Sequence, residues 1–249
     1  MKRVFFALSA VSVLTLGACG SSDDAQADSP ATELTKIGSR VPAPQPLSGS
    51  PITDSAVLQA SMLLTGDLPD GYESIPDPVR DLGLDPAPDY DSPDRSGTDP
   101  QACADVLAAL AGQSPGASAD AEVRYSGPEF SSIDEDAASY PDNGAAITFD
   151  TVQQTFEQCA DYSGTDADGI VVDYRLGARE QETIGDASTS IRLETTSEGF
   201  TLVSEAVVAV VDHTVLQVVV TSQEGVDPAS LTSLAASAAD RIRGIDTGV

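Results

Sequence analysis

The fold of this chain is decided by residues 200–221, FTLVSEAVVAVVDHTVLQVVVT. The stretch holds two runs rich in Val, Leu and Thr, 200–211 and 215–221, and such runs are typical of β-strands. Asp212-His213 between them is a short polar connection of the kind that joins paired strands. The stretch therefore predicts an antiparallel β-hairpin.

Two further strands precede this hairpin, and a helix follows it. Residues 170–176 and 189–195 have a similar composition, and turn residues separate the runs at Gly185-Asp186 and Glu198-Gly199. Four successive strands without intervening helices predict an antiparallel meander. Asp227-Pro228 then opens a final helix, because Asp caps helices well and Pro suits their first turn. The apolar stripe of that helix consists of Leu231, Leu234, Ala235, Ala238 and Ile242.

The region before the meander mixes predicted helices with short strands. A first helix begins near Asp54, and an exposed loop rich in Asp and Pro follows over 74–100. Asp99-Pro100 predicts the start of a second helix, and Asp150 is expected to cap a third. Short strands are expected at 121–125 and 145–149. The second and third helices have apolar stripes that contain Cys103, Val106, Leu107 and Leu110, and Val152, Phe156 and Cys159.

These elements predict an α+β fold, in which helices pack mainly on one face of an antiparallel sheet. Cys103 and Cys159 each lie on the apolar side of their own helix, so two helices on the same sheet face can bring the sulfurs together. We therefore expect one internal disulfide, Cys103–Cys159, worth about 4 kcal/mol on the chain-entropy estimate.

The N-terminus resembles a bacterial lipoprotein signal. Lys2 and Arg3 precede a short apolar run, and the tetrapeptide LGAC ends at Cys19, as in the lipobox where the cysteine is lipidated. This predicts a signal peptide over 1–18 and a protein held on the extracytoplasmic face of the cell membrane by lipid on Cys19. The alternative is an ordinary signal peptide with a coincidental cysteine.

Composition sets further limits. Residues 19–52 contain few large apolar side chains and several prolines, which predicts a lipidated tether before a domain over 53–249. Without residues 1–18 the chain has 10 basic and 40 acidic residues, a charge of −30. Such a surface repels nucleic acid and disfavours electrostatic binding to anionic lipid. Anchoring then depends on the acyl chains.

The sequence offers few candidates for catalysis or cofactor binding. The one histidine, His213, lies in the predicted hairpin turn, and no HExxH, P-loop or Gly-x-Gly-x-x-Gly motif occurs. Paired carboxylates can hydrolyse glycosides, but so many acids make close pairs inevitable, and a chain without Trp lacks the usual sugar platform. We therefore expect a non-enzymatic protein without catalytic residues, cofactor or metal.

Two acidic segments have some of the features of calcium loops. Asp161, Ser163, Asp166 and Asp168 precede Gly169, but the spacing fails the EF-hand pattern, and an acidic loop between helix and strand is the favoured interpretation. The same holds for the other segment, which contains Asp85, Asp89, Asp91 and Asp94.

The order of elements resembles the PknH-like extracellular sensor domain, an actinobacterial family found on receptor kinases and as free-standing lipoproteins. The resemblance spans about residues 55–245. It rests on LLTGDLP (63–69), DPQAC (99–103), FEQC (156–159), IGD (184–186), the 207–220 hairpin and the closing helix. This chain has Phe156 where the family often has Trp, and it lacks cysteines for a second disulfide. The resemblance implies sensing through a cleft beside the central sheet.

The sequence thus predicts an envelope lipoprotein with a sensor-like domain that binds a small molecule, a wall fragment or another envelope protein. A lipid carrier is the alternative, because consecutive valines in 207–220 could line an acyl-chain cavity as well as fill a core. A third possibility is a structural or adhesion module that binds through a surface patch.

Overall fold

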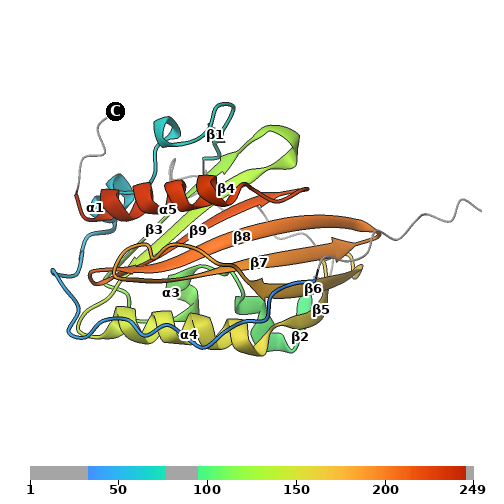
Figure 1. Cartoon of the computed structure of the whole chain (residues 1–249), viewed down its shortest axis with the longest axis horizontal. Helices are drawn as coiled ribbons and strands as arrows, with labels where there is room; N and C mark the ends of the chain where they lie inside the picture. Colours follow the sequence, from blue (N-terminus) through green and yellow to red (C-terminus); the bar gives the residue numbers. More distant parts are fainter. Residues whose placement is uncertain (1–32, 77–94, 245–249) are drawn as a thin grey trace, which may run out of the picture. The chain divides into compact units, whose positions relative to one another are not determined.

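A computed structural model describes residues 33–76 and 95–244. Within them, nine strands form one sheet in the order β1-β3-β4-β9-β8-β7-β6-β5-β2, with every neighbouring pair antiparallel (Figure 1). The strands are β1 (Glu73–Ser74), β2 (Gly97–Asp99), β3 (Ala119–Ser126), β4 (Ser132–Ser139), β5 (Asp161–Thr165), β6 (Val171–Ala178), β7 (Ala187–Ser197), β8 (Phe200–Val211) and β9 (Thr214–Ser222). The α+β class with an antiparallel sheet is confirmed.

Helices accompany the sheet along the chain. The α-helices are α1 (Ser55–Ala60), α3 (Leu110–Gln113), α4 (Gly144–Gln158) and α5 (Pro228–Ile242), and the 3-10 helices are η1 (Thr65–Asp67), η2 (Gln101–Asp105) and η3 (Pro128–Phe130). The first helix begins near Asp54 as predicted, and Asp54 caps it by accepting from Ala56 N. The predicted cap of the last helix is also present, since Asp227 accepts from Ser230 N. Among the described residues, no helix has the length and apolar character needed to cross a bilayer.

The predicted hairpin is the β8–β9 pair, and the meander is β6–β9. Val207 and Val211 belong to one buried cluster, whereas Val208 and Val210 belong to the other. Because successive side chains on a strand point to opposite faces, these two clusters lie on opposite sides of the sheet. The near-continuous valine run exists because both faces of the central strands are buried.

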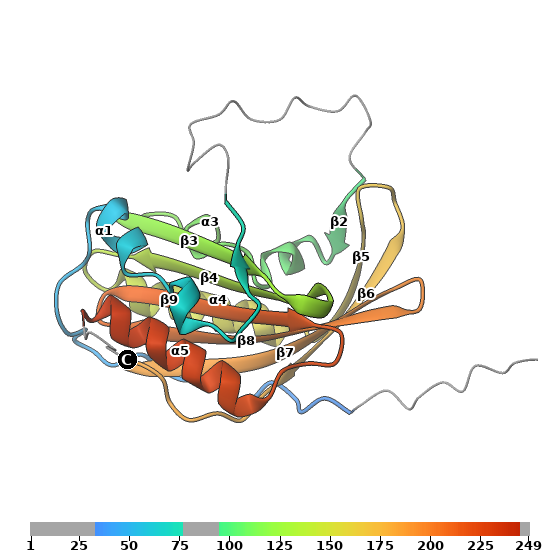
Figure 2. The ribbon, with the colours of Figure 1, turned by 90° about the horizontal axis from the view of Figure 1, so that it is seen from above.

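The helices cover both faces, which corrects the expectation that they pack mainly on one. We call the side packed by α1 and α5 the first face, and the side packed by α4, α3 and η2 the second face. Figure 1 shows α5 and α4 on opposite sides of the sheet, and Figure 2 shows α5 lying over the middle strands. The apolar stripes were identified, but a stripe does not specify which side of a sheet it meets.

Three predictions before the meander were wrong. Residues 145–149 are helical, because α4 begins at Gly144 and Asp150 therefore lies inside the helix. The strand that pairs with β9 on the side away from β8 is β4. It was not predicted as a strand, because its acidic residues suggest a loop. The helix expected after Pro100 is split into η2 and α3, since Leu107 between them adopts a φ of 60°, outside the helical region.

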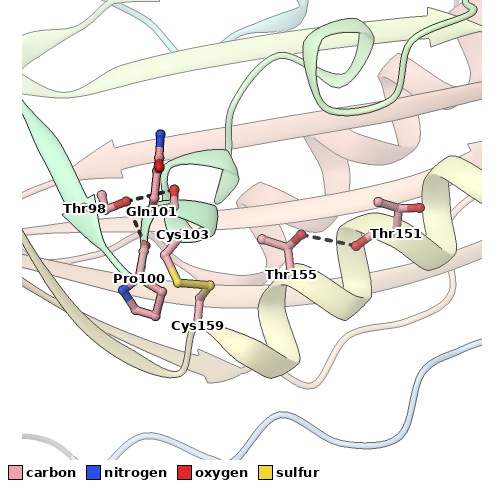
Figure 3. The surroundings of a disulfide bond; sticks show 7 residues. All are labelled: Thr98, Pro100, Gln101, Cys103, Thr151, Thr155 and Cys159. Atoms are coloured by element: carbon pink, nitrogen blue, oxygen red, sulfur yellow. Dashed lines mark hydrogen bonds between the residues drawn. A yellow bond between two sulfur atoms is a disulfide. The ribbon is translucent and has the colours of Figure 1, made fainter.

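The predicted disulfide joins η2 to the end of α4. Cys103 and Cys159 are 2% and 1% exposed, and their Cα atoms are 5.6 Å apart (Figure 3). The bond lies within the second-face core. It therefore fixes the segment that carries η2 against the sheet.

The segment expected to be a tether to residue 52 contacts the domain from Leu34 onward. Thr35 forms a β-bridge with Ala178, and the Gln153 side chain bonds both the N–H and the C=O of Val41. Ile37, Ala43 and Leu47 pack on the second-face core. Cys19 lies outside the described residues, so the structure does not test its lipidation.

Candidate functional site

The second face contains a cleft of about 310 Å³ where the helical cover ends. It opens over β3, β4, β8 and β9, beside the segment that links η2 to α3. Its lining residues are Leu107, Ala109, Glu122, Arg124, Asp134, Glu135, Asp136, Leu193, Ser204, Gln217, Val219 and Thr221. Clefts of this size accept small molecules.

Strand register places the polar side chains of the cleft in rows. Glu122, Asp136 and Gln217 are direct cross-strand neighbours on β3, β4 and β9. Arg124 and Asp134 form the next row, two residues further along each strand. Like charges directly opposite each other destabilise a sheet. The Glu122–Asp136 pair therefore lowers the stability of the sheet locally.

Asp136 is held in position by the chain that closes the cleft. Its Oδ1 accepts a hydrogen bond of 2.7 Å from Leu110 N, at the start of α3. Burial, together with the nearby carboxylates of Glu122 and Asp120, raises the pKa of Asp136 to about 6, against the opposing effects of the Leu110 hydrogen bond and Arg124. Burial also raises the pKa of Asp134. These carboxylates consequently favour an added cation.

Arg124 is the one cation in the lining. It pairs with Glu122, and its Nε lies 3.8 Å from Asp134 Oδ1. Its side chain is 60% exposed, so solvent weakens both interactions. The cleft keeps an excess of negative charge.

Gln217 lines the cleft, and of its side-chain amide only the nitrogen forms hydrogen bonds. The residue is 3% exposed, and its Nε2 donates 3.3 Å to the carbonyl of Leu107. Its buried Oε1 has no hydrogen-bond partner. A buried acceptor without a donor costs about 1–3 kcal/mol. Gln217 therefore provides an acceptor that a ligand could satisfy.

The rest of the cleft is mixed in character. The hydroxyls of Ser204 and Thr221 are 2.8 Å apart on neighbouring strands. Leu193 and Val219 belong to the second-face core and expose an apolar edge to the cleft. The site thus combines carboxylates at one side with an apolar wall.

His213 lies in the turn between β8 and β9 and is not part of the cleft lining. Its Nδ1 is 3.3 Å from the carbonyl of Tyr140, and its own carbonyl accepts from Tyr140 N. The side chain links the turn to the chain before α4. This is the hairpin position expected from the sequence.

The calcium-loop candidates form ordinary sheet structure where they are described. Asp161 and Ser163 belong to β5, a strand that sequence analysis placed in a loop. Asp166 Oδ1 accepts from the backbone N–H groups of Asp168 and Ile170, which closes the turn before β6. Within residues 33–76 and 95–244, no group of three or more His, Cys, Asp or Glu side chains is arranged to hold a metal ion. The other acidic segment, Asp85 to Asp94, lies outside the described residues.

The cleft residues were not identified from the sequence. Asp134 and Asp136 went unnoticed because β4 itself was missed. One signal was available in the meander, where Gln217 interrupts the run of apolar residues in 215–220. A polar residue in the middle of a strand that is buried on both faces needs a partner, and this need can point to a site.

Comparison with known proteins supports the fold. No family model and no curated protein matches the sequence. Among solved structures, the extracellular domain of PknH from Mycobacterium tuberculosis matches with a TM-score of 0.58 and 12% identity, covering 79% of this chain and all of that one. An uncharacterized Mycobacterium smegmatis protein, the Rv0999 ortholog, matches at a TM-score of 0.42 and 15% identity over 77% of this chain and 97% of that one.

The fold of this domain is therefore that of the PknH extracellular domain, as the sequence resemblance implied. At this identity the likeness concerns the fold alone. The chemistry of the cleft depends on this chain's own residues.

Proposed function

We propose that this chain is a non-enzymatic envelope lipoprotein whose sensor-like domain binds a small molecule in the cleft of the second face. The fold it shares with an extracellular domain supports an extracytoplasmic location. The lipobox-like LGAC sequence supports an anchor at Cys19. The domain then acts by binding.

Gln217 is the observation that carries this proposal. Its amide is almost fully buried beside the cleft, yet its oxygen has no partner in the protein. Structural side chains at such positions are normally satisfied. An unmet acceptor next to a row of carboxylates fits a binding site better than a purely structural surface.

The lipid-carrier alternative is less well supported by the packing. Val207, Val211, Val218 and Val220 pack in the first-face core, and Val208 and Val210 pack in the second-face core. Of the valines that could line an acyl-chain cavity, Val219 alone borders the cleft. The valine run therefore favours a filled core.

Native mass spectrometry of the detergent-extracted protein tests the binding role. We expect a polar small molecule to remain bound, and we expect Gln217→Met to lose it while the far-UV spectrum stays unchanged. A retained acyl lipid instead would support the carrier.

The anchor is tested separately by fractionating cells that express Cys19→Ala in the full chain. We expect this variant to leave the membrane fraction. Complete retention would contradict the lipoprotein assignment without bearing on the cleft.

A further inference from the structure

The charge of the cleft indicates which class of small molecule it accepts. The carboxylates of Glu122, Asp134 and Asp136 belong to the strand faces that line it, whereas Arg124 is its one cation. Glu135 also borders the cleft, but its carboxylate bonds Leu63 N on the first face. An anion entering the cleft meets net repulsion, and a cation relieves the unfavourable Glu122–Asp136 pair.

Gln217 gives an independent indication of the same kind. Its free Oε1 is an acceptor, so the group that satisfies it must be a donor. An ammonium group has three donor hydrogens and can bond an amide oxygen and two carboxylates together. Glu122, Asp136 and Gln217 form one cross-strand row and offer those three acceptors.

The arrangement of the carboxylates favours an organic cation over a metal ion. A metal ion needs several ligands that converge on one point. Among the described residues, no group of three or more His, Cys, Asp or Glu side chains is arranged in this way. Asp134 and Asp136 are two residues apart on β4, a separation of about 6.7 Å along a strand. Two separated anionic positions match two separated cationic groups.

We propose that the cleft binds a short aliphatic diamine. One ammonium group lies among Glu122, Asp136 and Gln217 Oε1, and the other lies at Asp134. The alkyl chain packs against Val219 and the apolar edge of the cleft. This inference rests on the proposed function, because it names the ligand class of the same site.

Binding of this ligand depends on pH through Asp136. Burial, Glu122 and Asp120 raise the pKa of this carboxyl to about 6, against the opposing effects of Arg124 and the hydrogen bond from Leu110 N. The ammonium groups need the ionised carboxylate. Affinity is therefore full at neutral pH and falls as the pH drops below about 6.

Isothermal titration of the protein with 1,4-diaminobutane tests the proposal. We expect one-to-one binding at neutral pH and physiological salt. 1,4-Butanediol, which lacks the charges, and Mg²⁺, which lacks the chain, are expected not to bind. The double variant Asp134→Asn/Asp136→Asn should lower the affinity about tenfold or more.

A matched control separates the cleft from the general acidity of the chain. Asp161→Asn/Asp173→Asn removes the same charge from exposed positions on β5 and β6, outside the cleft lining. This control should bind the diamine as the unaltered protein does. Equal losses in the two double variants, or equally tight Mg²⁺ binding, would show simple counter-ion attraction and overturn the proposal.

The remaining outcomes separate the ligand class from the proposed function. In one outcome the diamine does not bind, while the protein retains a neutral or anionic molecule that Gln217→Met loses. That result overturns the diamine as the ligand but supports the binding role. Failure of every probe, with no retained molecule, overturns both. If Gln217→Met does not fold, the double variant Asp134→Asn/Asp136→Asn decides the result, because it changes groups that are partly solvated.

Discussion

The two faces of the sheet use the acidic residues of one strand in opposite ways. β4 directs Glu135 toward the first face and Asp134 and Asp136 toward the second. On the first face Glu135 is 0% exposed, and its Oε2 accepts 2.6 Å from Leu63 N. On the second face the neighbouring carboxylates border a cleft.

The difference shows how burial divides the roles of similar side chains. The first face is closed by α5 and α1, and the buried carboxyl group of Glu135 ties the sheet to the turn after α1. The second face is closed only where the disulfide and α4 hold it, and the rest is left polar and accessible. The closed face contributes stability, and the open part of the second face is available for binding.

Loss of the disulfide should have the largest effect, because it alone joins η2 covalently to α4. We expect Cys103→Ala/Cys159→Ala to lower the free energy of unfolding by about 4 kcal/mol. Urea denaturation of the variant and of the parent protein measures this. Two freely alkylated thiols in the native parent would show that the bond does not form.

The second largest effect on stability is expected from shortening a side chain in the first-face core. Leu231 on α5 is fully buried, and Leu231→Ala should cost about 3 kcal/mol through lost burial and a residual cavity. Diamine affinity should not change, because α5 does not line the cleft. A variant of normal stability would show that α5 does not pack as described.

Glu135 should make the stability depend on pH. Burial raises its pKa to about 8, with Asp67 and Asp136 adding to the effect and Arg241 and the Leu63 hydrogen bond opposing it. The folded state therefore binds this proton more tightly than the unfolded state. Stability should fall as pH rises from about 4.5 to 8, by at most about 1.4 kcal/mol per pH unit, and then level off.

The variant Glu135→Gln isolates this contribution. It should remove the pH dependence of stability that is due to Glu135. Its free energy of unfolding relative to that of the parent protein should therefore increase as pH rises toward 8. Thermal unfolding across this range measures the difference. A difference in stability between the two proteins that is the same at every pH would mean that the pKa of Glu135 is not raised.

The cleft variant should have the smallest effect on stability. Asp134→Asn/Asp136→Asn should change the free energy of unfolding by less than about 1 kcal/mol, since it relieves repulsion but weakens the bond from Leu110 N. Its affinity for the diamine should nevertheless fall about tenfold or more. A large destabilisation would make these carboxylates structural, like Glu135, and would remove the contrast between the two faces.

The sequence predicted the elements whose signal is local. β8 has the bounds 200–211 that its composition indicated, and α5 begins directly after its Asp227 cap. The disulfide was also predicted correctly, because each cysteine lies on an apolar stripe. These features depend on periodicity, caps and turns, which neighbouring residues determine.

The cleft could not be predicted in the same way, because it depends on register between distant segments. Glu122, Asp136 and Gln217 are far apart in the chain and become neighbours only when β4 pairs with both β3 and β9. β4 has the sequence SIDEDAAS, whose polar residues suggest a loop. Its acids can occupy a strand because one is buried with a backbone donor and the others face the cleft.

The most direct test of this account is a crystal structure of the natively purified protein after soaking with 1,4-diaminobutane. We expect density for a linear molecule in the cleft, with one nitrogen within hydrogen-bond distance of Gln217 Oε1 and the other beside Asp134. A cleft filled by the protein's own side chains, with the ligand absent or bound elsewhere, would contradict it.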